Sequence, residues 1–338
     1  LAIGIFEAVQ NVLNKSSTKP KDISLVSLST TLATNALVED QGGSVALIFV
    51  GFRDGDLAKH KIHDALKGDP VLQTKGGHNH AGEETCQLNI EEIKEWIVNL
   101  NGVSAFAIAS QFATRNAAHE VKIIELIKSL GDKPITASHQ LSSKLNGPRR
   151  ALTAVLNARL IGIIDQLISR CEVTLSRMDI NAPLMVVRGD GALISSSEAR
   201  EKPIETILSG PAASIVGAKW MTDLTLGFVS DIGGTTTDVA LLKDGRPALD
   251  PAGARVGNFR TMVEAVAVRT TGLGGDSQVH FLSEGLKGGL HLGPKRLVPI
   301  SLLAHQEPHI HDVLDEQLRT SAPGEYDGKF VRLILNPV

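Results

Sequence analysis

The chain has 338 residues, of which 42% are hydrophobic and 21% are charged, so it can bury one or two substantial cores and is not a disordered protein. Its formal net charge of −3 offers no basic footprint for nucleic acid and no polybasic patch for a membrane surface, which favours small-molecule partners. Its two cysteines, Cys86 and Cys171, form neither a disulfide framework nor a C-x-x-C pair, so we expect a reducing, cytoplasmic location.

The first residues, Leu1–Val9, form an apolar run that Glu7 interrupts and that no basic residue precedes. This pattern predicts an amphipathic helix and argues against a signal peptide or a membrane span. We therefore expect the chain to start inside a domain.

Strand-like runs alternate with helical periodicity along most of the sequence. The predicted strands cover residues 23–29, 44–50, 105–110, 184–187, 226–231, 238–242, 265–270 and 278–282. The predicted helices cover residues 90–100, 117–130, 149–175 and 211–221. This alternation predicts an α/β fold with a mostly parallel sheet in the first half.

The stretch Ser142–Ser176 carries apolar residues at helical spacing, with Pro148 near its start. It predicts one long, largely buried helix that links two halves of the chain. We expect a domain boundary near residue 180, which divides the chain into residues 1–180 and residues 181–338.

Polar residues gather where the first predicted strand ends, in the run Ser29–Glu39. Hydroxyl and amide groups at the carboxyl end of a strand and the start of a helix are placed to bind an anionic or polar ligand. Thr31, Thr34 and Asn35 are the candidate substrate ligands. An ordinary helix N-cap is the alternative, although one cap needs only one hydroxyl.

Three further segments offer side chains for a substrate. Gly76–His80 contains His78, and Arg115–Glu120 contains the candidate catalytic base His119, although histidines in such loops are more often structural or exposed. Asp190 follows the strand at residues 184–187 and could line a cleft; a β-turn with a solvent ion pair is the alternative.

The most informative segment is Leu226–Leu242, which reads LGFVSDIGGTTTDVALL. An apolar strand ends in Asp231, a glycine-threonine turn follows, and Asp238 opens a second apolar strand. Without Cβ atoms, the turn glycines let backbone N–H groups approach phosphate oxygens, and threonine hydroxyls add donors. The candidate phosphate-binding residues are Gly233, Gly234, Thr235 and Thr236. Asp231 could hold a hydrated Mg²⁺, whereas a plain hairpin is the alternative.

A second glycine-rich segment, Gly272–Ser277, follows the predicted strand at residues 265–270. Gly272, Gly274 and Gly275 would allow close backbone approach to a nucleotide or substrate, and a tight structural turn is the alternative. The segment is not G-x-G-x-x-G, and no G-x-x-x-x-G-K-[ST] motif occurs, which argues against Rossmann and P-loop sites.

Four motifs occur in the order found in the hydantoinase A / 5-oxoprolinase family, which the chain resembles from about residue 1 to about residue 300. The motifs are Ser29–Glu39, Ser209–Ala213, Asp231–Val239 and Thr271–Ser277. The resemblance implies an actin-like (ribonuclease H-like) ATPase fold with two domains around a cleft. It also implies ATP and Mg²⁺ as ligands, a cyclic amide substrate, and a second subunit of the hydantoinase B type; we also expect a homo-oligomer.

One departure from the family pattern matters. Members of the family usually open with an earlier D-x-G-G-T-x-T-D hairpin, and this chain carries only the later copy, Asp231–Asp238. We interpret the chain as a fragment whose first domain is incomplete, so ATP turnover by the chain alone is not implied.

The resemblance implies the chemistry of the complete protein. Phosphate transfer to the oxygen of a hydantoin or 5-oxoproline carbonyl would give an activated imidate that water can attack. Asp231 and Asp238 would manage the cation and phosphate. The alternatives are a subunit of an ATP-dependent ketone carboxylase, a non-catalytic nucleotide switch or reactivating chaperone and, ranked lower, a sugar kinase. An enzyme should gather the run Thr30–Glu39, His78 and His119 around one cleft, whereas a switch would leave them scattered.

Overall fold

The computed structural model of the chain describes residues 2–282 and 289–320. The packing of Cα atoms divides it into two compact units, one made of residues 1–229 and 240–268 and the other of residues 230–239 and 269–338. The boundary predicted near residue 180 stays a prediction.

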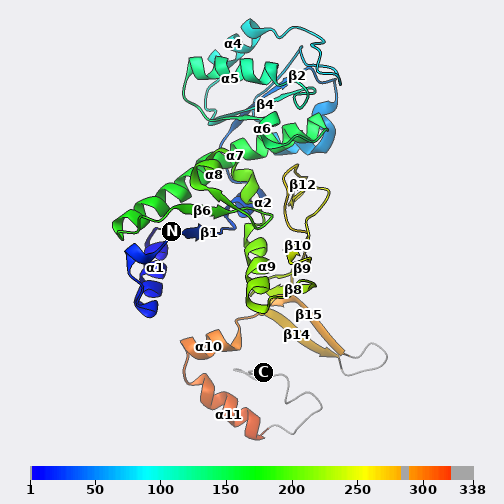
Figure 1. The fold of residues 1–338 in the computed structure, drawn as a ribbon. Coiled ribbons are helices and arrows are strands. Elements are labelled where there is room, and N and C mark those ends of the chain that lie inside the picture. The colour runs from blue at the N-terminus through cyan, green and yellow to red at the C-terminus, as the bar shows by residue number, and fades with distance from the viewer. Residues whose placement is uncertain (1, 283–288, 321–338) are drawn as a thin grey trace. The chain divides into compact units, whose positions relative to one another are not determined.

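A four-stranded parallel sheet, in the order β3-β2-β4-β5, forms one lobe of the first unit (Figure 1). Its strands are β2 (Val45–Val50), β3 (Val71–Thr74), β4 (Ala105–Ser110) and β5 (Ile135–Ala137). Every residue of β2 and β4 is buried, because a parallel sheet covered on both faces requires continuous apolar strands. The predicted parallel α/β arrangement is therefore confirmed.

Successive residues of the central strands pack against different layers. Ala46, Ile48 and Val50 of β2 share a core with the helices α4 (Ile90–Val98) and α5 (Ala118–Leu130). The alternate residues Val45, Leu47 and Phe49 belong to the core that contains α7 (Gly147–Arg177). Because successive side chains of a strand point to opposite faces, the two faces of this sheet pack against different helices.

Helix α7 is the predicted long buried helix, and it runs through the core of the unit (Figure 1). Asn146 caps its start through a hydrogen bond from the Arg149 N–H at 3.2 Å, and Pro148 lies in its first turn. It is the one described helix whose length and composition would allow it to cross a membrane. However, 72% of the apolar window is buried inside the protein, as in the core helix of a globular fold.

An ion pair fastens α7 to the start of the parallel sheet. The Arg159 guanidinium, 7% exposed, bonds the Asp69 carboxylate at 2.6 Å and the carbonyls of Ala65 and Leu66 at 2.8 and 3.1 Å. The same carboxylate accepts the Val45 N–H at 2.9 Å. The Asp69 carboxylate therefore neutralises the buried Arg159 and links α7 to Val45, the first residue of β2.

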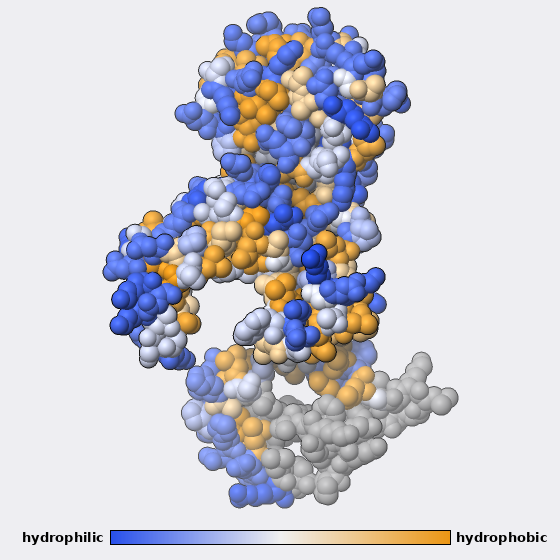
Figure 2. Space-filling view, in the orientation of Figure 1, coloured by the Kyte–Doolittle hydropathy of each residue, from blue (hydrophilic) through white to orange (hydrophobic). Residues whose placement is uncertain are grey.

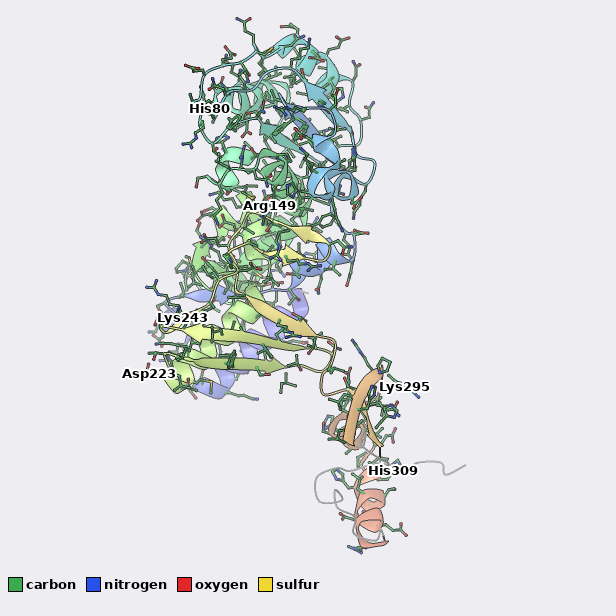
Figure 3. All side chains as sticks on the ribbon, turned by 90° about the vertical axis from the view of Figure 1, so that its right-hand side faces the viewer. His80, Arg149, Asp223, Lys243, Lys295 and His309 are labelled. Atoms are coloured by element: carbon green, nitrogen blue, oxygen red, sulfur yellow. The ribbon has the colours of Figure 1, made fainter. Side chains whose placement is uncertain are left out.

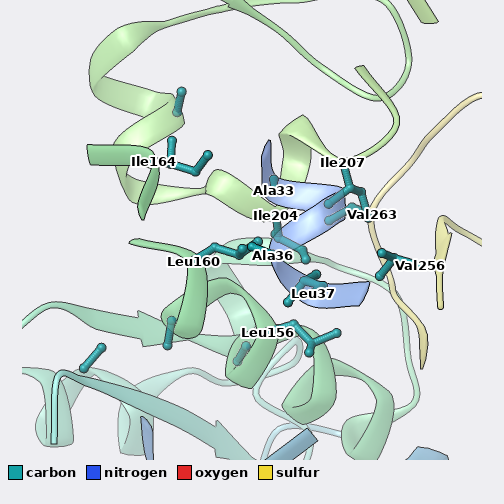
Figure 4. Packing of buried hydrophobic residues seen from close by; sticks show 14 of the residues in the cluster. Ala33, Ala36, Leu37, Leu156, Leu160, Ile164, Ile204, Ile207, Val256 and Val263 are labelled. Atoms are coloured by element: carbon teal, nitrogen blue, oxygen red, sulfur yellow. The ribbon is translucent and has the colours of Figure 1, made fainter. Parts of the chain in front are cut away.

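A smaller sheet in the same unit has the order β1-β6-β7. Its strands are β1 (Val26–Leu28), β6 (Leu184–Val187) and β7 (Leu193–Ser195), and β1 runs parallel to β6 with Val26 opposite Leu184. Figure 4 shows the neighbouring helix α2 (Leu32–Val38) packed through Ala33, Ala36 and Leu37 toward the α7 side chains Leu156 and Leu160.

The remaining described elements of the first unit surround these sheets. They are α1 (Ala2–Ser16), α3 (Ile62–Leu66), α6 (Ser138–Leu141), α8 (Ser196–Glu201), α9 (Ser209–Thr222), β10 (Arg246–Pro247), β11 (Arg255–Val256) and β12 (Phe259–Arg260), with 3₁₀ turns at Pro20–Asp22, Asp56–Lys61 and Pro203–Thr206. Ala212 and Ile215 of α9 pack on Ala240, Leu242 and Val266. Figure 2 shows apolar residues at the surface over α9, whose outer face carries Trp220 and Met221, 83% and 79% exposed.

Three strands cross the boundary between the units: β8 (Gly227–Ile232), β9 (Thr237–Lys243) and β13 (Val268–Thr271). Strand β9 pairs with β8, β10 and β13. The second unit also contains the antiparallel pair β14 (Ser277–Leu282) and β15 (Gly289–Arg296), followed by α10 (Ile300–Gln306) and α11 (Ile310–Thr320).

Candidate functional site

The carboxyl ends of β1 and β6 lie at one sheet edge, because the two strands are parallel neighbours. Thr30 and Thr31 follow β1, and Arg188–Asp190 follows β6. The sheet therefore gathers two predicted substrate-binding segments that are more than 150 residues apart in sequence, at the edge where α/β proteins bind ligands.

Hydroxyl groups at this edge join α2 to the start of α9. The Thr34 hydroxyl accepts the Leu208 N–H at 3.1 Å, and the Ser209 hydroxyl donates to the Thr30 carbonyl at 2.9 Å. Thr34 is therefore committed to packing two helices together. Thr31 and Asn35 are exposed, and their side chains lie 3.4 Å apart (Oγ1 to Nδ2), so they are the two of the three candidate residues that can reach a ligand.

Asp190 lies in a charged cluster with Arg188 and Glu205. The Arg188 guanidinium lies 3.2 Å from the Asp190 carboxylate and 3.4 Å from that of Glu205. Burial raises the pKa of Glu205, against the opposing effect of the Arg188 charge. The Arg188 Nε and Glu205 Oε2 atoms are buried but form no aligned hydrogen bond within the described chain, so this pair is held by charge alone. The Gly191 N–H donates to the Arg188 carbonyl at 3.1 Å, so the β-turn of the alternative is present and contains the ion pair between Arg188 and Asp190. This pair is only partly open to solvent, since the two side chains are 27% and 17% exposed.

The two candidate histidines lie together at the carboxyl edge of the larger sheet, with ring centroids 4.4 Å apart. His119 is 1% exposed and His78 is 2% exposed. Figure 3 labels His80 in the same loop of this lobe. His78 binds the Gln111 carbonyl through its backbone N–H at 3.2 Å, and burial lowers the pKa of its imidazole.

Both ring nitrogens of His119 are used inside the protein. The Gly77 N–H donates to Nδ1 at 2.9 Å, so the proton lies on Nε2, which donates to the Glu84 carboxylate at 2.7 Å. In this tautomer neither nitrogen can take a proton from a substrate. The geometry favours a role for His119 in holding the loop that contains Gly77 and Glu84, and its catalytic role stays a prediction.

The glycine-threonine hairpin of the second unit is braced by the segment Gly272–Ser277. The Gly275 N–H donates to the Gly233 carbonyl, and the Asp276 N–H donates to the Gly234 carbonyl, each at 2.9 Å. A Cβ atom on Gly274 would lie 2.4 Å from the Gly234 carbonyl oxygen and 2.7 Å from that of Gly233. Gly274 therefore has to be glycine for the segment to approach the hairpin so closely.

This bracing sets the direction of the free donors of the hairpin. In a trans peptide unit the C=O and N–H groups point in opposite directions. The bonded carbonyls of Gly233 and Gly234 face the bracing segment, so the N–H groups of Gly234 and Thr235 face away from it. Both residues are exposed, and neither N–H has a partner among the described residues. Two N–H groups on the same side of a braced turn can bind a phosphate oxygen.

Side chains complete the hairpin. The Thr237 hydroxyl donates to the Leu273 carbonyl at 2.7 Å, and Asp238 accepts a hydrogen bond from Thr270. Asp231 lies at the exposed end of β8, two residues before Gly233, and its role as a cation ligand beside the turn stays a prediction. Within residues 2–282 and 289–320, no group of three His, Cys, Asp or Glu side chains could hold a metal. A Mg²⁺ ion would therefore need phosphate and water oxygens as well, which it prefers.

Gly272 and Gly275 differ from Gly274 in their surroundings. A Cβ atom on Gly272 would meet no atom within 4 Å, and one on Gly275 would make ordinary contact at 3.7 Å. The sequence did not reveal that the N–H of Gly275 is used within the protein. It also did not single out Glu84, Glu205 or Asp276, whose partners come from distant segments.

The comparisons with known proteins agree with this architecture. The model of the Hydantoinase/oxoprolinase N-terminal region matches residues 1–131, and the Hydantoinase/oxoprolinase model matches residues 150–297. The chain belongs to the hydantoinase/oxoprolinase family.

Curated relatives and a solved structure are also similar. The caprolactamase subunit alpha of Pseudomonas jessenii is 24% identical over 302 residues, 81% of this chain and 42% of the relative. The acetophenone carboxylase gamma subunit of Aromatoleum aromaticum is 24% identical over 339 residues, 87% of this chain and 45% of the relative. The crystal structure of the ATP-dependent caprolactamase from Pseudomonas jessenii has a TM-score of 0.73 at 23% identity, over 98% of this chain and 51% of that chain. This likeness confirms the predicted actin-like α/β fold, and the chain spans less than half the length of these two curated relatives.

Proposed function

We propose that this chain is the nucleotide-binding part of an enzyme that uses ATP to hydrolyse a cyclic amide. The observation that carries the proposal is the braced hairpin, whose Gly234 and Thr235 N–H groups face outward together. The family membership and the likeness to an ATP-dependent caprolactamase support ATP as the phosphate donor.

The residues present fit the phosphate part of a nucleotide. The N–H groups of Gly234 and Thr235 would hold phosphate oxygens, and Asp231 would orient the hydrated Mg²⁺. Bound ATP supplies a phosphoryl group that converts a poorly reactive amide carbonyl into a good electrophile. Thr31 and Asn35, exposed at the β1–β6 edge, would be available to an organic substrate, whereas the Asp190 carboxylate accepts the Ala192 N–H at 3.0 Å and pairs with Arg188.

An enzyme should gather the run Thr30–Glu39, His78 and His119 around one cleft, and the structure does so only in part. The run that begins at Thr30 lies at the same sheet edge as Asp190, whereas His78 and His119 are buried at the edge of the other sheet. We therefore assign the histidines to loop structure and place substrate binding at the β1–β6 edge.

A subunit of an ATP-dependent ketone carboxylase is the second candidate, favoured by the similarity to the acetophenone carboxylase gamma subunit. In either case we propose that a second subunit completes the active site and that the assembly is a homo-oligomer of such units. The free cysteines, an exposed Cys86 and a buried Cys171, support a cytoplasmic location.

The test is an ATP hydrolysis assay of the complete protein with its partner subunit, against hydantoins, 5-oxoproline, lactams, and ketones with bicarbonate. Stimulation by a cyclic amide supports the proposal. Stimulation by a ketone with bicarbonate selects the carboxylase. If none of these compounds stimulates ATP hydrolysis, the hydrolase and the carboxylase are both contradicted. The non-catalytic nucleotide switch is then the remaining candidate.

Asp231→Asn should lower the ATP-dependent turnover of the complete protein by about 10²-fold, because a preorganised charge at the phosphate site contributes on that scale. In the variant, the neutral amide oxygen of asparagine holds a hydrated Mg²⁺ more weakly than the carboxylate does. Turnover measured against Mg²⁺ concentration checks this, since the variant should need more Mg²⁺. Asp223→Asn is the matched control, because Asp223, labelled in Figure 3, is an exposed aspartate at the end of α9 whose carboxylate lies 3.5 Å from the Lys219 ammonium. Unchanged turnover and Mg²⁺ dependence in Asp231→Asn would rule out the cation role.

A further inference from the structure

A cavity lies in the first unit at the start of α7, and none of its lining residues belongs to the proposed phosphate or substrate site. Its volume is about 240 Å³, and it lies beside the β11–β12 hairpin, where Figure 3 labels Arg149. Its lining comes from the loop before α7, from the first turn of that helix and from two segments around β11 and β12. A water molecule occupies about 30 Å³ of liquid, so the cavity can hold a small molecule with its hydration.

Arg149 is the charged group built into this wall. Its Nε donates to the Arg260 carbonyl at 3.1 Å, and its Nη2 donates to the Thr261 carbonyl at 2.5 Å and to the Ala252 carbonyl. Three backbone carbonyls thus fix the plane of the guanidinium. Its Nη1 has no hydrogen-bond partner in the described part of the chain, although a guanidinium offers five N–H donors.

No carboxylate lies within ion-pair distance of Arg149 in residues 2–282 and 289–320. The two acids nearby already have cationic partners: Asp250 pairs with Arg260, and Glu264 pairs with Lys144 at 3.5 Å. Burial and the Arg260 charge lower the pKa of Arg149, and the Asp250 charge, which lies beyond ion-pair distance, raises it. The positive charge of Arg149 is therefore offset only at a distance. Arg149 is half-buried, and no carboxylate of the described residues contacts its guanidinium, so its Nη1 donors are available to an anion in the cavity.

The backbone around Arg149 strengthens this interpretation. Arg149 lies in the first turn of a 31-residue helix, whose N-terminal end attracts anions. Gly253 faces Arg149 with φ +83°, and a Cβ atom there would lie 2.5 Å from the Thr261 carbonyl oxygen and 3.1 Å from Nη2 of Arg149. Any side chain at position 253 would therefore displace either the carbonyl that braces the guanidinium or the guanidinium itself.

We propose that this cavity binds a small oxyanion, a carboxylate or phosphate group, through Nη1 of Arg149, with Lys144 at its rim. A planar guanidinium recognises such groups well, because its fork matches their geometry. Lys144 is 53% exposed and its pairing with Glu264 is loose, so it can turn toward a bound anion. The site is independent of the hairpin of the second unit and of the proposed reaction.

The experiment measures binding of inorganic phosphate and of succinate to the chain by calorimetry at low ionic strength. The wild-type chain should bind one of these anions with an affinity that falls as salt is added. Arg149→Met keeps most of the stem and removes the fork, and it should weaken the binding by about tenfold or more. Thermal unfolding of the variant shows whether it is folded.

Lys144→Met keeps the test valid if Arg149→Met does not fold, because Lys144 is an exposed rim residue. It should weaken binding a few-fold and leave the midpoint of thermal unfolding unchanged. Lys243→Met, at an exposed lysine labelled in Figure 3, is the control and should bind like the wild type. Loss of phosphate binding alone identifies a phosphate site, and loss of succinate binding alone identifies a carboxylate site. Wild-type affinity for both anions in Arg149→Met and Lys144→Met, or no binding by the wild type, overturns the proposal.

Discussion

Gly274→Ala should weaken the binding of an ATP analogue by about 100-fold or more, because hydrogen bonds to a charged group contribute about 1.5–3 kcal/mol each and two would be lost. The new methyl group would lie 2.4 Å from the Gly234 carbonyl oxygen, a distance that backbone atoms cannot accept. The bracing segment would have to withdraw from the hairpin. The N–H groups of Gly234 and Thr235 would then lose their common direction.

Calorimetry of the complete protein with a non-hydrolysable ATP analogue and Mg²⁺ measures this effect. Gly227→Ala is the matched control, since it places a methyl group in open space on the strand that leads into the same hairpin. The control should bind the analogue like the wild type. Equal affinities of Gly274→Ala and the wild type would show that the bracing does not orient the phosphate donors.

Asp69→Ala should lower the free energy of unfolding by about 3–5 kcal/mol, because it leaves the Arg159 guanidinium buried without its carboxylate. The substitution also removes the acceptor of the Val45 N–H and of the Ser44 hydroxyl, at 2.9 and 2.7 Å. Chemical denaturation followed by circular dichroism gives the free energy and the slope of the transition.

Two further variants separate the ion pair from a general effect of removing an acid. Asp64→Ala changes an exposed aspartate on α3 and should alter the free energy of unfolding by no more than about 0.5 kcal/mol. Arg159→Met combined with Asp69→Ala should recover part of the loss, since no unpaired charge remains buried. A double variant less stable than Asp69→Ala would contradict this account of the pair.

The sequence predicted the framework of the fold well. The apolar runs at residues 44–50 and 105–110 became β2 and β4, and the stretch from 142 to 176 became α7. These segments carry strong patterns, because burial on both faces of a sheet requires a continuous apolar run and a buried helix repeats its apolar residues at helical spacing. Short strands such as β5 and β7, each three residues long, have no such pattern and were not predicted.

The candidate site was predicted in its parts but not in its connections. The hairpin from Asp231 to Asp238 was recognised from its residue types. The N–H groups of Gly275 and Asp276 brace this hairpin from a loop that lies 42 residues later in the chain. The path of that loop could not be predicted from the hairpin sequence. The burial of His119 depends likewise on Gly77 and Glu84, which are 42 and 35 residues away. Sequence spacing carries no information on such partners.

The central claim is that the N–H groups of Gly234 and Thr235 hold the phosphates of a nucleotide. A crystal structure of the complete protein with Mg²⁺ and a non-hydrolysable ATP analogue tests it most directly. We predict phosphate oxygens at about 3 Å from both nitrogen atoms, as in ordinary N–H···O hydrogen bonds, with Asp231 facing the Mg²⁺ ion. A nucleotide bound elsewhere, with both N–H groups still facing solvent, would contradict the claim.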